Sequence, residues 1–416
     1  MKPNLFLITT DFPYGRGEAS FILPELPYLS EKFNVTIISN SLDDEQTVHL
    51  GKDIKVIHYD RQASLLWKIW DSICFFGNKS AYIEMADIVR SKTKVIKRLT
   101  ESILFFEEAR RFKRYLKKNH ILKIDEPSIV YCYWYTYYCL TMTEYFSRNS
   151  NLKIVTRTHR YDLYDEGYQG ERQPFKKQMD RQLDGVVFIA EHGRQYYLDK
   201  YCSGVMSDKY QLFRLGVKPL SNITERVFSK QEEFHLVSCA LVISRKRVKM
   251  IVDALTEIAD FHIKWTHFGD GSDYEDLCIY AQDQLGQLDN ISYALKGYVE
   301  SDDIMRYYEE NQIDAFITTT ASEGCPVSVQ EAMAYGIPII GTTVAEIPYM
   351  IRGNGILLSE NPDKKEVAQA IGRIHDLSES EMLEMRKCSY ELWKSHFDAE
   401  INAVKFTKYL EGLVES

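Results

Sequence analysis

Short apolar segments of strand length alternate along the chain with longer amphipathic segments of helical period. Parallel strands that are buried on both faces read as nearly continuous apolar runs, and helices connect them. A first series of predicted strands covers residues 4–8, 35–39, 54–58, 129–133, 154–158, 186–190 and 211–214. A second series covers residues 234–240, 263–268, 291–295, 315–319, 338–341 and 356–358. The pattern therefore predicts an α/β protein with two doubly wound parallel sheets.

A polar stretch, residues 215–234, separates the two series and contains Gly216, Pro219 and Ser221. The length of 416 residues also exceeds the roughly 250–300 residues at which a single hydrophobic core stops growing. We place the boundary near residues 217–232. The expected domains are an N-terminal Rossmann-like domain, residues 1–220, and a C-terminal one, residues 221–395.

The net charge of -9 argues against nucleic acid as the main partner, because nucleic acid requires a broad basic surface. The eight cysteines show neither a CxxC pair nor metal-ligand spacing with histidine, so we expect buried thiols in a reducing compartment. No stretch approaches the ~20 apolar residues of a membrane span, and the apolar run in residues 1–10 is too short for a signal peptide. These features predict a cytoplasmic protein.

Open parallel sheets bind ligands at the carboxyl ends of their strands, so residues that follow the predicted strands are candidates for chemistry. Five such places carry polar residues or glycines: residues 15–18, 159–162, 245–247, 269–271 and 322–331. No Asp-x-Asp pair follows a strand in a ligand position, so no metal site is predicted.

The richest of these places follows strand 315–319, where two carboxylates flank the start of a predicted helix. Pro326 suits the first helical turn, whose free N–H groups and positive dipole end favour an anion such as a diphosphate. Glu323 and Glu331 could then contact one ligand at two levels, one at sugar hydroxyls and the other at ribose hydroxyls. The alternative is that Glu323 caps the helix and Glu331 is a solvated helical residue.

A cluster of three cations, Arg245, Lys246 and Arg247, precedes another predicted helix. Cations are unfavourable at a helix N-terminus unless an anion compensates them. The cluster therefore favours a phosphate ligand over an exposed helix start.

Several segments resemble family-4 retaining glycosyltransferases with the GT-B fold. EGCPVSVQEAMAYGIPIIGT is similar to the signature of that family. SCALVISRKRVKMIVDAL resembles its first C-domain strand and helix, FGDGS its Gly-x-Gly turn, and KGYVESDDIMRYY its base-side loop. RTHRYDLYDE resembles the segment with the acceptor-side histidine, and TTDFPYGRGEASF the glycine-bearing loop after strand one. Bacterial transferases that build surface polysaccharides show this pattern best.

The resemblance implies that the two domains face each other across a cleft and that a final helix, residues 396–416, packs back on the N-terminal domain. It implies transfer of a sugar from a UDP or GDP donor to a glycan or lipid-linked acceptor, with retention and with neither a metal nor a cofactor. A sugar-nucleotide epimerase of similar architecture and a non-catalytic sugar-binding subunit are the alternative functions.

The resemblance also implies roles for individual residues. Glu323 would contact the donor sugar, Lys246 the departing diphosphate, and His159 the sugar near the reacting carbon, which makes these three the catalytic candidates. Glu331 would hold the ribose, with Gly17 and Arg245 near the phosphates. The remaining donor-side positions are Gly324, Cys325, Pro326, Val327 and Ser328, and the acceptor-side positions are Arg160 and Asp162.

Some positions depart from the family or have simpler interpretations. Leu241 stands where the family often has an arginine, so Arg245 or Arg247 would replace that cation, and Arg160 stands where the family often has glycine. His159 could be structural, and the loop at Gly17 could be an ordinary βα turn. Residues 269–271 could form a tight turn, and packing is the simpler interpretation of Tyr298.

Residues 92–123 carry eleven Lys or Arg against three Glu, next to the aromatic-rich segment 65–76. Such a combination could contact an anionic membrane at its surface. The alternative is a solvated helical face beside a core helix.

Overall fold

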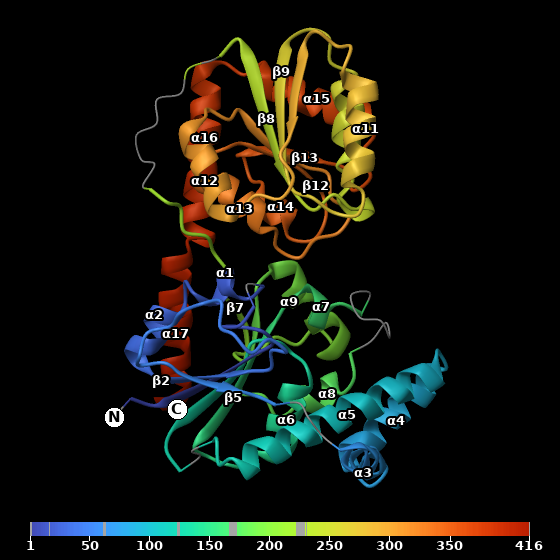
Figure 1. The fold of residues 1–416 in the computed structure, drawn as a ribbon, viewed down its shortest axis with the longest axis vertical. Helices are drawn as coiled ribbons and strands as arrows, with labels where there is room; N and C mark the ends of the chain where they lie inside the picture. Colours follow the sequence, from blue (N-terminus) through green and yellow to red (C-terminus); the bar gives the residue numbers. More distant parts are fainter. Residues whose placement is uncertain are drawn as a thin grey trace. The chain divides into compact units, whose positions relative to one another are not determined.

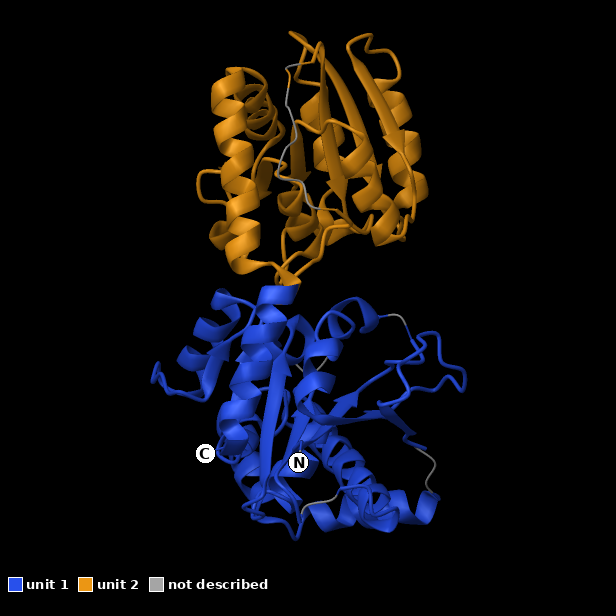
Figure 2. Ribbon diagram, turned by 90° about the vertical axis from the view of Figure 1, so that its left-hand side faces the viewer, with its two compact units in different colours: residues 1–214, 400–416 blue, residues 215–399 orange. Residues whose placement is uncertain are grey.

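The computed structural model describes residues 2–15, 17–60, 64–122, 125–165, 173–221, 229 and 231–415. The chain forms two compact units. Unit 1 comprises residues 1–214 and 400–416, and unit 2 comprises residues 215–399 (Figures 1 and 2).

Unit 1 is built on a seven-stranded parallel sheet with the order β3-β2-β1-β4-β5-β6-β7. Its strands are β1 (Asn4–Thr9), β2 (Asn34–Ser39), β3 (Lys55–His58), β4 (Ser128–Cys132), β5 (Leu152–Thr158), β6 (Gly185–Phe188) and β7 (Tyr210–Leu212). The strand order reverses between β1 and β4, which is where open α/β sheets bind ligands.

Helices cover both faces of this sheet (Figure 1). They are α1 (Ala19–Ile22), α2 (Leu26–Lys32), α3 (Leu65–Phe75), α4 (Lys79–Ser91), α5 (Val95–Lys118), α6 (Tyr137–Tyr145), α7 (Arg160–Leu163), α8 (Lys176–Asp180), α9 (Glu191–Tyr201) and α17 (Ala399–Glu415). Alternate residues of β1 face two different cores, since Ile8 packs with residues of α5 and Leu7 packs with Phe406 of α17. The last helix of the chain thus completes the core of unit 1.

Unit 2 repeats the arrangement with six parallel strands in the order β10-β9-β8-β11-β12-β13. These are β8 (Glu233–Cys239), β9 (His262–Phe268), β10 (Ile291–Leu295), β11 (Ala315–Thr318), β12 (Ile339–Thr342) and β13 (Gly355–Leu358). The helices are η2 (Ser244–Lys246, a 3-10 turn), α10 (Lys249–Leu255), α11 (Tyr274–Leu285), α12 (Ser301–Glu310), α13 (Val327–Ala334), α14 (Ile347–Met350), α15 (Lys364–His375) and α16 (Glu379–His396). Here the order reverses between β8 and β11.

The predicted fold class is confirmed, because each predicted strand is present with its ends within two residues of the predicted ones. The apolar runs were informative because central strands such as β4 and β6 are buried throughout their length. Among the described helices, none is long and apolar enough to cross a membrane.

Candidate functional site

The loops that follow β8 and β11 lie side by side at the switch point of unit 2. The two strands are parallel neighbours, so their carboxyl ends share one edge of the sheet. The loops are joined directly, because the N–H of Ala321 donates to the carbonyl of Arg245 at 2.8 Å. Thr319 adds a hydroxyl hydrogen bond to the carbonyl of Arg247 at 3.0 Å. The predicted residues on the two loops are therefore held together.

Lys246 and Glu323 form an ion pair across these two loops, and both side chains are largely buried. Lys246 ends the short turn η2, and Glu323 lies in the loop between β11 and α13. The sequence predicted both residues as ligand contacts but did not predict that they contact each other. The pair places one cation and one carboxylate at the edge where a ligand would enter.

Arg247 has a structural role in the same place. Its backbone is left-handed, with φ 53°. Its guanidinium donates to the carbonyls of Thr319 (2.6 Å), Thr320 (2.9 Å) and Glu360 (2.9 Å) and to the side chain of Asn361 (3.1 Å). These bonds fix the loop after β11. Arg247 is therefore poorly placed to replace the missing cation at Leu241, whereas the side chain of Arg245 is exposed.

Glu331 is buried in α13 and accepts a hydrogen bond from the hydroxyl of Ser301, the first residue of α12. Burial raises the pKa of its carboxyl to about 7, and Asp302 adds to the rise, while the bond from Ser301 opposes it. The thiol of Cys239, which ends β8, is close enough to Glu331 and Lys246 for both charges to act on its pKa. Glu331 is thus part of the switch-point cluster, and its interpretation as a solvated helical residue is wrong.

The start of α13 differs slightly from the prediction. The helix begins at Val327, and Pro326 precedes it with ψ 120°, so Pro326 lies just before the first turn instead of inside it. Gly324, Cys325, Val327 and Ser328 are half-buried around this helix start. The N–H groups of a first helical turn have no partner within the helix, so they remain available to an anion.

The turn at residues 269–271 packs beneath the loop that carries Lys246. Gly269 and Gly271 have φ of 132° and 154°, and a Cβ atom at these positions would lie 2.0 Å from the carbonyl oxygen of Ala240 and 2.5 Å from that of Val242. Glycine is needed here because no side chain fits between the backbones. The tight turn is therefore the interpretation that the structure supports.

Tyr298 is 65% exposed, so its interpretation as a packing aromatic is wrong. It follows β10 at the same edge of the sheet as the other candidates.

In unit 1, His159 lies at the carboxyl end of β5 between two aromatic rings. Its ring centroid is 4.8 Å from that of Tyr133 and 4.3 Å from that of Trp134, both of which follow β4. Nε2 of this ring is buried and has no hydrogen-bond partner within the described part of the chain, whereas Nδ1 lies 3.9 Å from the carboxylate of Asp162. Unsatisfied buried nitrogens are rare in native structures and often mark a functional site.

The carboxylate of Asp162 is buried and positions this histidine, so it is not exposed to solvent. Its two carboxylate oxygens accept from the backbone N–H of His159 at 2.6 Å and of Tyr135 at 2.8 Å, which ties the loop after β5 to the loop after β4. The fully buried Lys176 contacts the carbonyl of Asp162, and burial lowers the pKa of this lysine to about 8. Arg160 is half-buried in α7.

Glu18 holds the loop after β1 in place by hydrogen bonds, a role that was not predicted from the sequence. Its carboxylate accepts from the backbone N–H groups of Thr10 (3.0 Å), Asp11 (2.9 Å) and Phe12 (2.8 Å) and from the indole of Trp134. Burial raises the pKa of Glu18 to about 7, and a hydrogen bond with Asp11 also raises it, whereas the backbone bonds lower it. Through Trp134, this loop is connected to the ring of His159.

Gly17 belongs to the same loop, next to Arg16, which lies outside the described residues. A Cβ atom at Gly17 would be 3.2 Å from the carboxylate of Asp11, whereas one at Gly15 would be only 2.2 Å away. A side chain at Gly15 would therefore displace Asp11 further than one at Gly17 would, and the proximity of Gly17 to a ligand stays a prediction.

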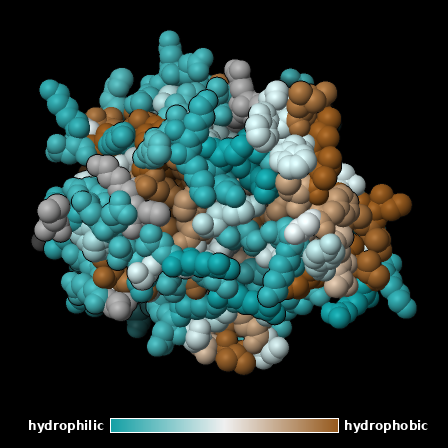
Figure 3. Space-filling model, turned by 90° about the horizontal axis from the view of Figure 1, so that it is seen from below, coloured by the Kyte–Doolittle hydropathy of each residue, from teal (hydrophilic) through white to brown (hydrophobic). Residues whose placement is uncertain are grey.

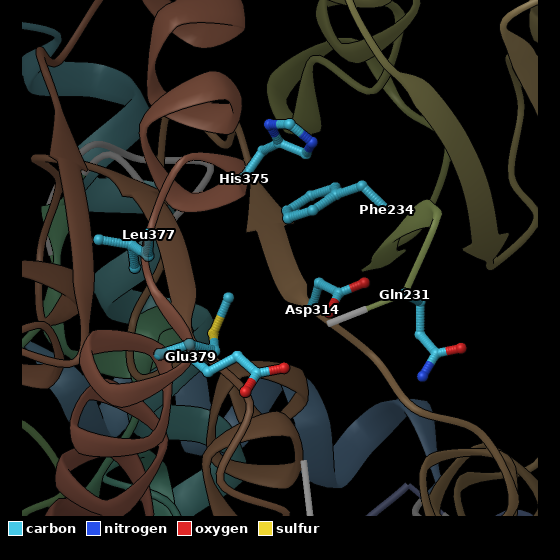
Figure 4. A pocket seen from close by; sticks show the side chains of 7 residues that line it. Gln231, Phe234, Asp314, His375, Leu377 and Glu379 are labelled. Atoms are coloured by element: carbon cyan, nitrogen blue, oxygen red, sulfur yellow. The ribbon is translucent and has the colours of Figure 1, made fainter. Parts of the chain in front are cut away.

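A small cavity in unit 2 lies away from these residues, at the amino ends of β8 and β11 (Figure 4). Phe234, Asp314 and His375 line it, and it contains none of the predicted site residues. Among the described residues, no group of three or more His, Cys, Asp or Glu side chains is arranged to hold a metal ion.

Comparisons with known proteins agree with this geometry. Residues 233–376, which include Lys246, Glu323 and Glu331, match the family described as glycosyl transferases group 1. WcaL of Escherichia coli K12, named as a glycosyltransferase of colanic acid biosynthesis, is 22% identical over 269 residues. The match covers 63% of this chain and 64% of WcaL, which is less than two thirds of that relative.

Solved structures of low sequence identity share the fold over the whole chain. Sucrose-phosphate synthase from Thermosynechococcus elongatus has a TM-score of 0.66 at 15% identity, with 99% of both chains covered. The lipopolysaccharide outer core galactosyltransferase WaaB has a TM-score of 0.64 at 17% identity, with 99% of this chain and 100% of that chain covered. Residues 233–376 thus form a domain of the glycosyl transferases group 1 family, and the two parallel-sheet units of the chain have the GT-B fold.

Proposed function

We propose that this protein transfers a sugar from a UDP or GDP donor to a glycan or lipid-linked acceptor, with retention of configuration, during assembly of a bacterial surface polysaccharide. The observation that carries the proposal is the cluster of Lys246, Glu323 and Glu331 at the switch point of the matched domain. The names of WcaL and WaaB support the assignment to surface polysaccharides.

In the proposed reaction, the bond between the anomeric carbon and the phosphate oxygen breaks, and the acceptor oxygen bonds to the same face of that carbon. The acceptor proton passes to the departing phosphate oxygen. Lys246 neutralises the charge that grows on this phosphate. The diphosphate competes with Glu323 for the lysine, which leaves the carboxylate to accept hydroxyls of the sugar.

Glu331 is proposed to accept the ribose hydroxyls, with Ser301 orienting its carboxylate. A carboxylate that is already removed from water forms strong hydrogen bonds with a diol, because it has little hydration left to lose. The half-buried start of α13, residues 324–328, supplies N–H groups for the phosphates. Arg245 adds a second cation from its exposed position.

For His159 we propose a hydrogen bond to the donor sugar. Its buried Nε2, which has no hydrogen-bond partner among the described residues, supports this role within unit 1. Gly17 near the phosphates, and Arg160 and Asp162 on the acceptor side, complete the proposal. For Asp162 the role is indirect, because its carboxylate holds backbone groups.

We further propose that the transfer needs neither a divalent metal nor an organic cofactor, so that EDTA leaves it unchanged. The enzyme would act in the cytoplasm at the inner face of the cell membrane, where lipid-linked acceptors are found.

A panel of UDP and GDP sugars tests the proposal, each incubated with the protein in the presence and absence of lipid-linked and free glycan acceptors. Release of the nucleoside diphosphate should require both a donor and an acceptor, and nuclear magnetic resonance should show the donor's anomeric configuration in the product. An epimerase would alter the sugar without an acceptor, and a non-catalytic subunit would bind donors without turnover. Either result, or an inverted linkage, would refute the corresponding part of the proposal.

A further inference from the structure

Helix α3 exposes its apolar side chains instead of burying them. It buries Asp71 and Phe75, while the large apolar side chains of its outer face are between 49% and 78% exposed. These side chains are Leu65, Leu66, Trp67, Ile69, Trp70, Ile73 and the following Phe76. Most recur at intervals of three and four residues, so they lie on one face of the helix. The interpretation of residues 65–76 as a core helix is therefore wrong.

Ion pairs hold α3 in this orientation. The buried carboxylate of Asp71 contacts the guanidinium groups of Arg110 (2.9 Å) and Arg114, both on α5. The side of α3 that carries Asp71 and Phe75 thus faces the protein, whereas the exposed apolar side chains face outward. Apolar side chains gather on the right-hand side of the face shown in Figure 3, where α3 to α5 lie in Figure 1. A contiguous exposed apolar patch of this kind marks an interaction surface.

A groove of about 860 Å³ borders this helix, lined by residues of α3, the loop after β3, and the last turns of α5. Five cations line it, against the single carboxylate of Asp60. Arg111 and Arg114 already pair with Glu107 and Asp71, respectively. Lys113, Lys117 and Lys118 have no ion pair with a carboxylate among the described residues.

The environment of Lys113 shows that positive charge exceeds negative charge in the groove. Burial lowers the pKa of Lys113, and the neighbouring cations Lys117, Arg110 and Arg114 lower it further, while Asp71 opposes them only in part. Arg114 also lies over the ring of Trp67, 4.7 Å from its centroid, so the groove and the apolar face of α3 are contiguous. An anion in the groove would relieve the repulsion between these cations.

We propose that α3 and the last turns of α5 form one membrane-docking surface, in which anionic phosphate headgroups enter the groove and the apolar face of α3 enters the bilayer interface. This proposal rests on the proposed function. It adds how the enzyme would reach a lipid-linked acceptor. The positive charge of this surface favours an anionic membrane over a second copy of the chain. A second copy of the chain on this face would bring two sets of lysines without carboxylate partners together, whereas an anionic leaflet supplies both phosphate and hydrocarbon.

Some cations near the groove pair with carboxylates and others do not, and this difference determines which variants can test the proposal. Removal of Arg110 or Arg114 would take away one of the two cations that neutralise the buried Asp71 and would destabilise the helix pair. Lys113→Gln, Lys117→Gln and Lys118→Gln together remove only cations that lack a carboxylate partner. Lys123 of the basic run lies outside the described residues and is left unchanged.

The test is sedimentation of the full chain with vesicles of phosphatidylglycerol and phosphatidylcholine, compared with phosphatidylcholine alone. The wild type should bind the anionic vesicles and be released by high salt, because screening shortens to about 3 Å at 1 M. The triple variant should bind roughly 100-fold less, since each lysine contributes about fivefold. A matched variant, in which the exposed Lys52, Lys405 and Lys408 become Gln, should bind like the wild type.

The apolar face has its own variant, Leu66→Gln with Ile73→Gln, which should weaken vesicle binding without changing its dependence on salt. The proposal is overturned if the wild type ignores anionic vesicles, or if the matched variant loses as much binding as the groove variant. Concentration-dependent dimers in light scattering that the Leu66→Gln, Ile73→Gln variant abolishes would instead assign the face to a second copy. Donor-induced thermal shifts, measured in parallel, show whether the proposed transfer site is intact, so that the two proposals fail independently.

Discussion

Lys246 is held in place by its surroundings rather than by helix propensity. Its turn is fixed to the loop after β11 through the carbonyl of Arg245 and the guanidinium of Arg247. Its ammonium group contacts Glu323. A cation fixed in this way needs little reorganisation when charge develops on a leaving phosphate, which is the condition for electrostatic stabilisation of a transition state.

We expect Lys246→Ala to lower the rate of sugar transfer by about 10²–10³, the usual scale for loss of one such group. Single-turnover kinetics with saturating donor would measure it. Arg245→Ala is the matched control and should lower the rate much less. A loss below threefold for Lys246→Ala, with a large loss for Arg245→Ala, would assign the role to Arg245.

Glu331 should make the stability of the protein depend on pH. Its pKa is raised from 4.5 to about 7 by burial, so the folded state retains a proton that the unfolded state has released. Its contribution to stability is therefore fully present below about pH 4.5 and is lost as the pH rises through 7, by an amount of about 3 kcal/mol.

Glu331→Gln keeps the size of the side chain and an acceptor for Ser301 but removes the charge. Chemical denaturation should show a smaller loss of stability between pH 5 and pH 8 than in the wild type. The same variant should bind the donor about tenfold or more weakly, because a charged hydrogen-bond partner of the ribose is lost. Equal pH dependence in both proteins, or unchanged donor affinity, would contradict these roles.

In each unit, one side chain holds a loop at the switch point by hydrogen bonds to several backbone groups. Arg247 donates hydrogen bonds to backbone carbonyl groups in unit 2, and Glu18 accepts hydrogen bonds from backbone N–H groups in unit 1. Such side chains replace the hydrogen bonds that a regular element would have supplied. The loop of Glu18 also reaches Trp134, which lies against His159.

We expect Glu18→Gln to destabilise unit 1 by about 1–3 kcal/mol, because the amide would turn a donor toward backbone N–H groups and leave some of them unsatisfied. The rate of transfer should fall as well, through displacement of Trp134 from His159. Denaturation followed by tryptophan fluorescence, together with kinetics, measures both effects. Glu31→Gln, at an exposed position, is the control. Equal stability and equal rates of transfer in the two variants would refute the role of Glu18 in holding the loop.

Each unit of the whole molecule repeats one design, a parallel sheet whose order reverses beside its first strand. The predicted donor contacts Lys246, Glu323 and Glu331 belong to unit 2, and His159 belongs to unit 1. We therefore expect a bound donor to stabilise mainly unit 2.

A UDP or GDP sugar that is the true donor should raise the free energy of unfolding by about 2.7 kcal/mol at 100 times its Kd. A thermal-shift screen over such sugars would detect it. Glu331→Gln should lose most of the shift at the same concentration, whereas the exposed Glu31→Gln should keep it. A screen in which neither class of sugar shifts the wild type would argue against both donors.

The sequence by itself determined the strands, the fold class and the segments that hold the candidate site. Central parallel strands are apolar along their whole length, so they can be identified from local pattern alone. The residues at the switch point of unit 2 could also be predicted, because one short segment carries Glu323, the helix start and Glu331.

Only the tertiary structure decided which charges are already neutralised and which faces are exposed. Asp71 pairs with residues 39 and 43 positions away, and Glu18 receives a hydrogen bond from a residue 116 positions away. The same applies to the role of Arg247, the exposure of Tyr298, and the outward face of α3. A local pattern records the spacing of polar and apolar residues. It cannot record the partner that removes a charge, because that partner is brought close only when distant elements pack together.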